Sequence, residues 1–236
     1  MRREAPAAIK EATVTPIPLP VAVAEARVEM VRERLMEEIL LLTGEVGFRN
    51  AAVQEALDRC GGNVVQFYKQ FANKEECFTV AYETWIERVA ADLLEAAERE
   101  APSWRRGLRA ALVELFEFVT ERPAISRALF LEVQIVGGPA MDTREAVMER
   151  LARAVDSARE EIPADQAPPQ TTSMFIVGGV EACVCGALAG NRPEQVWEAL
   201  PELMHFAVGP YFGEEAARAE FDAAREAAER EGRGAR

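Results

Sequence analysis

The segment Gly61-Gly-Asn-Val-Val-Gln-Phe-Tyr-Lys-Gln-Phe-Ala-Asn-Lys-Glu-Glu76 decides the fold of this 236-residue chain. It begins with a glycine turn, continues as a short helix, and leads through a second turn into a new helix. Phe67 and Phe71 lie one helical turn apart, so we expect them to pack the core of this unit. Short helices that meet at a glycine turn predict a helix-turn-helix, which can place its second helix in a DNA major groove.

Both helices of this unit begin with the same capping pattern. Asn63 can cap the first helix, with Gln66 at the reciprocal position of a capping box. Asn73 and Glu76 repeat the pattern ten residues later. The sequence therefore predicts helix starts directly after Asn63 and Asn73.

The segment from about Val28 to Phe78 resembles the DNA-binding domain of the TetR (tetracycline-repressor-like) transcriptional regulators. The resemblance implies an all-α fold, with an N-terminal three-helix helix-turn-helix domain and a C-terminal helical ligand-binding and dimerisation domain. The rest of the chain is compatible with such a domain. The matching positions are Gly47, Phe48, Val53, Gly61, Phe67, Tyr68, Phe71 and Lys74.

The segment also departs from the family pattern. Ala51-Ala52 replaces a threonine pair that caps the second helix and contacts a phosphate, so we expect Asn50 to provide the cap. Gly62-Asn63 replaces Val-Ser, and Val64-Val65-Gln66 stands where small, polar or basic residues often face the bases. The segment contains nine acidic and six basic residues, a net charge of −3, although phosphate neutralisation by Lys and Arg supplies much of DNA affinity.

Several residues are nevertheless candidates for contacting DNA. The resemblance implies that Tyr68 donates to a phosphate; the alternative is a half-buried structural tyrosine. A phosphate would explain Lys74 at a helix start, where the dipole disfavours a cation, and the alternative is a solvated lysine. Gln66 could read adenine or serve only the capping box. The predicted DNA contacts are Arg49, Asn63, Val64, Gln66, Tyr68, Lys69, Gln70 and Lys74.

Composition limits the class of protein. With 49% hydrophobic and 28% charged residues, the chain can bury a sizeable core. The formal net charge of −13 excludes a general affinity for nucleic acid or anionic membranes, although a specific regulator can be acidic overall if its recognition face is locally basic.

Cysteine and histidine usage argues against a metal centre, a cofactor or an enzyme. We interpret Cys60 and Cys77 as reduced packing thiols. Cys183 and Cys185 are two residues apart on a predicted helix, so they cannot share a metal or bond to each other. His205 is the single histidine, and no phosphate loop, paired-carboxylate cleft or nucleophile-base pair occurs.

The sequence indicates a cytoplasmic protein without a membrane span. Acidic residues and prolines interrupt the stretch after Arg2-Arg3, which excludes a signal peptide. Residues 171–190 are mostly apolar but contain Glu181 and four glycines, so we interpret them as a buried helix.

Periodicity and helix breakers divide the rest of the chain. Pro201 should kink or split its helix at Leu200, and Gly209-Pro210 should end it. We expect a flexible arm at 1–24, a helix-turn-helix domain at 25–73, a ligand and dimer domain at 74–212, and a charged C-terminal helix or tail at 213–236. The expected helices are 25–46, 51–60, 63–70, 74–99, 103–120, 123–136, 140–162, 170–190, 193–209 and 213–232.

Large apolar side chains on the middle helices suggest a cavity for a small apolar or aromatic molecule, and the alternative is that core packing alone accounts for them. Glu181 is either at the solvent edge or a polar anchor in the cavity or dimer seam. The predicted cavity residues are Trp104, Phe116, Phe118, Phe130, Met174, Phe175 and Glu181.

A face of small side chains on the 170–190 helix permits close helix-helix approach. With the 193–209 helix, it resembles the four-helix dimer bundle of the TetR family, and the competing interpretation is a core helix of a monomer. The predicted interface residues are Gly178, Gly179, Ala182, Gly186, Trp197 and Leu200.

These patterns lead to one hypothesis and one alternative. The hypothesis is a homodimeric TetR-like regulator, a repressor that binds operator DNA and a small, largely apolar effector. The alternative is a TetR-shaped dimer that has lost operator binding and binds a partner or a small molecule. The acidic motif and the apolar Val64-Val65 pair favour the alternative.

Overall fold

A computed structural model describes residues 21–231 of the chain, with side chains from 29 to 230. Within that range the secondary structure is helical and contains no strand, which confirms the all-α class. The predicted arm lies outside the described residues except for 21–24. Those four residues are helical, so the first helix begins earlier than predicted because the alanine-rich Val-Ala-Val-Ala start favours helix.

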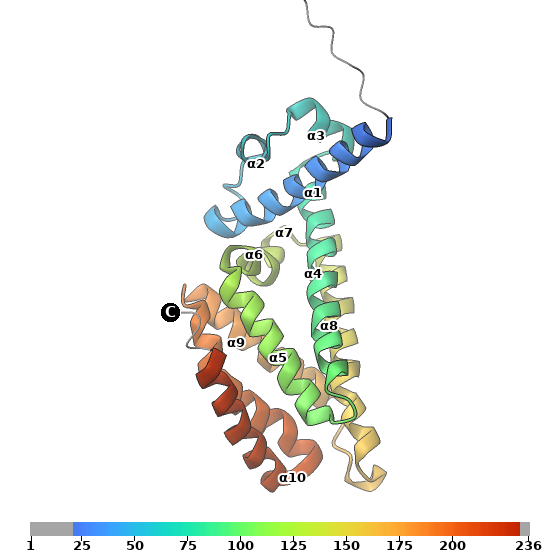
Figure 1. The fold of residues 1–236 in the computed structure, drawn as a ribbon, viewed down its shortest axis with the longest axis vertical. Helices are drawn as coiled ribbons and strands as arrows, with labels where there is room; N and C mark the ends of the chain where they lie inside the picture. The colour runs from blue at the N-terminus through green and yellow to red at the C-terminus, as the bar shows by residue number, and fades with distance from the viewer. Residues whose placement is uncertain (1–20, 232–236) are drawn as a thin grey trace, which may run out of the picture.

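Three helices form the N-terminal unit, drawn in blue and teal in Figure 1. Its core contains Phe48, Phe67, Phe71 and Phe78, all buried. The rings of Phe67 and Phe71 are 5.7 Å apart, which confirms their predicted role in the core. The helices are α1 (Val21–Val46), α2 (Val53–Cys60) and α3 (Val64–Gln70).

The N-cap bonds at Asn63 and Asn73 agree with the sequence, but the reciprocal bonds of the capping boxes do not form, since Glu76 accepts the Ala72 backbone N–H instead. Asn63 accepts the Gln66 backbone N–H at 2.9 Å, and Asn73 accepts that of Glu76 at 2.8 Å, as predicted. Asn50 does not cap α2, contrary to the prediction. Its side chain instead donates to the Val46 carbonyl at the end of α1, and α2 starts without a side-chain cap.

A single long helix leads from this unit into the rest of the molecule. That helix, α4 (Lys74–Arg99), has the predicted bounds and lies beside α8 along the long axis in Figure 1. The main hydrophobic core is continuous from α1 to α10. The other helices are α5 (Trp104–Glu121), α8 (Pro139–Asp156), α9 (Thr172–Ala189) and α10 (Val196–Glu231), with short 3-10 turns η2 (Ser157–Glu161), η3 (Ala164–Gln166) and η4 (Pro193–Gln195).

The predicted 123–136 helix is interrupted by a π-helical turn. It consists of α6 (Pro123–Arg127), the π turn η1 (Ala128–Glu132) and α7 (Val133–Val136). In Figure 1, α6 and α7 lie directly beneath α1. π turns inside helices are often found at functional sites, and this one joins the two halves of the molecule.

The prediction for the last helices was wrong in its break points. Neither Pro201 nor Pro210 splits α10, and the residue with non-helical dihedrals is Gly213 (φ 81°, ψ 174°). Burial of Leu200, Met204 and neighbouring side chains offsets the backbone bonds that the prolines remove, since one buried side chain contributes about 1.5–3 kcal/mol. The chain turns at Gly213 because glycine tolerates a positive φ.

The predicted C-terminal tail folds back as the second half of α10. Its Ala217, Ala224 and Ala227 are buried in the main core. Glu220, only 8% exposed, pairs with Arg109 of α5 and lies 3.9 Å from Arg105. This half of α10 is therefore an integral part of the C-terminal domain.

Among the described residues, α9 is the one helix long and apolar enough to cross a membrane by length and composition. Its Ile176, Val184 and Leu188 are buried against the protein. A core helix passes the same test, but only one face of α9 is buried, against α8 and α10, so the prediction of a buried helix holds for that face alone.

The backbones of α1 and α6 approach each other closely at Gly44. A Cβ atom added to Gly44 would stand 1.7 Å from the Ala124 carbonyl oxygen. We predict that Gly44→Ala lowers the free energy of unfolding by about 3 kcal/mol, because backbone rather than a flexible side chain must move.

Gly209→Ala is the matched control, since its Cβ would meet only the Ala217 side chain at 3.8 Å. We expect it to be neutral or to stabilise by about 0.5–1 kcal/mol. Urea unfolding followed by circular dichroism compares the two variants. Equal midpoints would mean that α1 can move away from α6 at no cost.

Candidate functional site

The outward face of α3 carries most of the predicted DNA contacts. Because Phe67 and Phe71 point into the core, Tyr68 points away from it and is 63% exposed. The Tyr68 ring packs edge-on against Phe67, with ring centroids 5.1 Å apart, so this contact restricts the orientation of the exposed phenol. Of the predicted contacts, Arg49, Asn63, Val64, Gln66, Tyr68 and Lys69 are exposed, and Gln70 is half-buried.

Lys74 points inward rather than toward solvent. Its Nζ donates to the carbonyl oxygens of Phe48 at 2.7 Å and Ala51 at 3.0 Å, and lies 4.3 Å from the centre of the Phe48 ring. These contacts fasten the start of α4 to the turn between α1 and α2. A phosphate is therefore not needed to explain a cation at this helix start.

Other cations of the N-terminal unit are paired with its own carboxylates. Arg59 bonds Glu45 at 2.9 Å and Glu55 at 2.8 Å. The hydrogen bond to Glu45, then that to Glu55, raises the pKa of Arg59. Arg32 pairs with Glu29 at 3.2 Å and lies over the Phe71 ring. This pairing leaves few cations available to phosphates.

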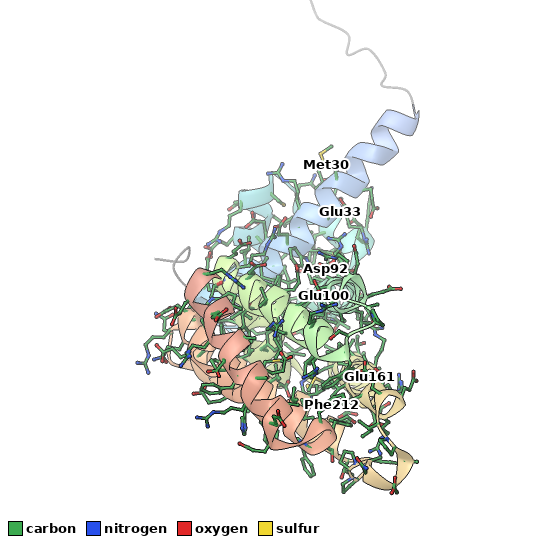
Figure 2. All side chains as sticks on the ribbon, turned by 60° about the horizontal axis from the view of Figure 1, so that its bottom comes forward. Met30, Glu33, Asp92, Glu100, Glu161 and Phe212 are labelled. Atoms are coloured by element: carbon green, nitrogen blue, oxygen red, sulfur yellow. The ribbon has the colours of Figure 1, made fainter. Side chains whose placement is uncertain are left out.

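The C-terminal domain contains a cavity of about 610 Å³ between α4, α5, α8 and α9. Its walls are mostly apolar, with Leu93, Leu112 and Val177 among them, and Trp104 lies at its rim. Exposed residues of the α4–α5 turn and of η2 border it, so it opens at the end of the domain farthest from α1. Figure 2 labels Glu161 at this end and Met30 of α1 at the other.

A smaller chamber of about 60 Å³ adjoins the cavity and shares Leu93, Leu115 and Leu151 with it. Its polar wall consists of Tyr82, Arg144 and Glu181. Arg144 Nε donates to Glu181 at 2.8 Å, and Arg144 Nη2 bonds the same carboxylate. Glu181 therefore lies in the chamber as a paired carboxylate, one of the two positions considered for it.

The other predicted cavity residues are scattered. Trp104 borders the large cavity and Phe130 the small chamber. Four others line neither, because two fill space inside the domain and two lie on its surface. Phe116 is buried against Trp197, Phe118 packs on Trp85, and Met174 and Phe175 are exposed at 43% and 69%.

The small-residue face of α9 is open within the chain. A Cβ on Gly178 or Gly186 would meet nothing within 4 Å, and one on Gly179 would meet only Phe206 at 4.0 Å. Ala182 is exposed, and Phe206 is 51% exposed. With Phe175, these residues form an apolar surface on α9 and α10.

Two residues predicted for a dimer interface belong to the core instead. Trp197 is 5% exposed and its ring meets Phe116 edge-on at 5.7 Å, while Leu200 is fully buried. Both side chains point toward α5 because α10 packs on that helix. That correction leaves the four small residues of α9 as interface candidates.

The segment from α6 to η1 connects the N-terminal unit with the cavity. Arg127 Nε donates to the Gly44 carbonyl of α1 at 3.2 Å, and its Nη1 bonds the Leu188 carbonyl of α9. Glu132 accepts the Phe48 backbone N–H at 2.8 Å. Between these two residues, Leu129 and Phe130 border the small chamber.

The pairing of several of these residues could not be predicted from the sequence. Arg144 and Glu181 lie 37 positions apart, and Arg127 and Gly44 lie 83 apart. One feature of the sequence that indicates the chamber is Tyr82, a tyrosine among the apolar residues of α4. Among the described residues, no group of three or more His, Cys, Asp or Glu could hold a metal ion, and the four cysteines are free.

These features define a two-domain helical protein with an exposed helix-turn-helix and an internal cavity. No protein-family model and no curated protein matches the sequence. A transcriptional regulator from Rhodococcus sp. Rha1 has a similar structure, with a TM-score of 0.56 and 18% identity over 85% of this chain and 96% of that chain. A TetR family transcription regulator from Marinobacter aquaeolei VT8 gives 0.56 and 18% over 86% and 97%.

The chain therefore has a TetR-like fold, as the sequence resemblance indicated. This fold comprises an N-terminal helix-turn-helix and a C-terminal helical domain, and the likeness spans both. At 18% identity it establishes the architecture and leaves the activity to be argued from the residues.

We predict that Lys74→Ala lowers the free energy of unfolding by about 1–3 kcal/mol, because two carbonyl groups lose a charged donor. The control is Lys69→Ala, whose exposed side chain should change stability by less than about 0.5 kcal/mol. Urea unfolding measures both variants. If Lys74→Ala leaves stability unchanged but weakens DNA binding, Lys74 contacts a DNA phosphate as the sequence first suggested.

Proposed function

We propose that this protein is a homodimeric, cytoplasmic, TetR-like transcriptional regulator that binds operator DNA and acts as a repressor controlled by a small, largely apolar effector. The observation that carries the proposal is an exposed α3 joined through one continuous core to a cavity of about 610 Å³. The two solved structures compared above are both described as transcription regulators.

The DNA side of the proposal assigns separate tasks to the exposed residues of α3. Gln66 and Lys69 face the bases, where a glutamine can bond adenine through two hydrogen bonds. Tyr68 donates to a phosphate and so fixes the register of the helix. In a dimer, the two copies of α3 fill successive major grooves when they lie about 34 Å apart.

The control side of the proposal rests on the segment from α6 to η1. Leu129 and Phe130 border the small chamber, and the neighbouring Arg127 and Glu132 bond backbone groups near the end of α1. A ligand that binds better to one position of this segment shifts the spacing of the two α3 helices. Operator affinity then falls by the difference in binding free energy between the two conformers.

One observation favours the alternative of a partner-binding or small-molecule-binding dimer without operator DNA. Half of the six cations between residues 28 and 78 are occupied: Arg32 by one glutamate, Arg59 by two glutamates and Lys74 by two carbonyls. Val65, at the start of α3, is 67% exposed where a polar residue would read bases. Non-specific DNA affinity should therefore be low even if specific binding is retained.

A band-shift experiment at low salt decides between the two functions. The DNA is the region flanking the protein's own coding sequence, together with a randomised library. A sequence-specific complex that weakens steeply with salt supports the regulator. The absence of any specific complex would falsify operator binding and favour the alternative.

We predict that the double variant Glu45→Gln, Glu55→Gln binds operator DNA roughly threefold to tenfold more tightly at low salt, because it frees Arg59 beside α3 and removes two repelling charges. The control, Glu95→Gln with Glu149→Gln, changes the net charge equally and frees Arg99 and Arg153 in the C-terminal domain.

Fluorescence anisotropy with a labelled operator measures both variants. An equal gain in the control would mean that net charge, rather than Arg59, sets the affinity. If neither double variant binds the operator more tightly, Arg59 does not contact the DNA.

We predict that Gly179→Leu converts the dimer to monomer, since overpacking a close contact costs about 1–3 kcal/mol. Within the chain, the new side chain meets only Phe206, so the fold should survive. Ala91→Leu, on an exposed position of α4, is the control. Sedimentation velocity measures both, and an unchanged dimer for Gly179→Leu would place the interface elsewhere.

A further inference from the structure

Tyr82 carries a buried hydroxyl group without a hydrogen-bond partner among the described residues. Its side chain is 0% exposed, stacks on Phe78 with ring centroids 6.2 Å apart, and lines the small chamber. An unpartnered buried hydroxyl usually costs stability, so its retention requires a reason. Phenylalanine would fill the same space without that cost.

The hydroxyl lies beside the polar wall of the small chamber. Burial raises the pKa of Tyr82, while the nearby Arg144 charge lowers it and Glu181 raises it. Tyr82, Arg144 and Glu181 line the same chamber, so the phenol lies beside the ion pair, and the raised pKa keeps the phenol protonated as a donor. A chamber of about 60 Å³ is large enough for one water or one small polar group.

The charges around the two spaces disfavour an anion. Glu98, Glu160 and Glu161 border the large cavity, and Glu181 borders the chamber. In the part of the chain that the structure describes, Arg144 is the single cation lining either space, and Glu181 already binds it. A carboxylate that entered the chamber would lose its hydration without gaining a free cation.

We propose that the ligand of this cavity is an elongated, uncharged, apolar molecule that presents one hydrogen-bond acceptor to the Tyr82 hydroxyl. Its apolar body occupies the large cavity, and its polar end, such as an alcohol, ketone, ester or amide oxygen, enters the small chamber. This inference rests on the proposed function in identifying the cavity as the effector site.

The test is a set of probes with one ten-carbon chain and different head groups. Isothermal titration calorimetry of the full-length protein at neutral pH compares 1-decanol with decanoate. We expect 1-decanol to bind about tenfold or more tightly than decanoate, because only the carboxylate must lose a charge's hydration. Equal or tighter binding of decanoate overturns the proposal.

The variant Tyr82→Phe tests the hydroxyl directly. We expect the affinity for 1-decanol to fall roughly threefold to tenfold, the effect of one hydrogen bond, while decanoate binding changes little. The unliganded variant should melt at the same temperature as the wild type or higher, because no bond within the protein is lost. Unchanged 1-decanol affinity overturns the proposal.

Ser126→Ala is the matched control. Ser126 is also fully buried, its hydroxyl is also unpartnered among the described residues, and it lines neither space. Its removal should leave 1-decanol affinity unchanged, and a loss equal to that of Tyr82→Phe counts against a specific role for Tyr82. If Tyr82→Phe fails to fold, the head-group ratio in the wild type decides the question.

The outcome of this experiment does not depend on whether the protein binds an operator. If a specific DNA complex forms but 1-decanol is not preferred, the proposed regulator stands and the proposed class of ligand is rejected. The decanol preference without any DNA complex keeps the ligand class and rejects the regulator.

Discussion

The close approach of α1 and α6 at Gly44 is the constraint on which the rest of the structure depends. Only a residue without a side chain lets the Ala124 carbonyl come so near the helix. At this distance Arg127 reaches both the Gly44 carbonyl of the N-terminal unit and the Leu188 carbonyl of α9. One missing methyl group therefore sets the angle between the surface that α3 presents and the cavity behind it.

Local features of the fold could be predicted from the sequence because their causes are local. Asn63 and Asn73 cap their helices through bonds to residues three positions away, and Phe67 and Phe71 meet one turn apart. The inward turn of Lys74 could not be predicted. Its carbonyl partners lie 26 and 23 residues away, and nothing in the sequence shows that they converge.

The cavity illustrates a second limit of prediction. Large aromatic residues suggested where a ligand would bind, yet Phe116 and Phe118 fill space in the core. The space instead lies between α4, α5, α8 and α9 and is lined mostly by aliphatic side chains such as Leu93, Leu112 and Val177, whereas the small Gly107 lets α5 pack closely on the α4 backbone at Ala97. Small residues in a helix look the same whether they allow close packing or leave a void, so only the three-dimensional arrangement distinguishes them.

The position of the cavity opening has a kinetic consequence. Glu161 at its rim lies at the opposite end of the molecule from Met30 of α1, as Figure 2 shows. A protein seated on an operator through α3 would leave this end facing solvent. Its ligand could then load while the complex is intact, so the response time would follow arrival of the ligand and not spontaneous release from the operator.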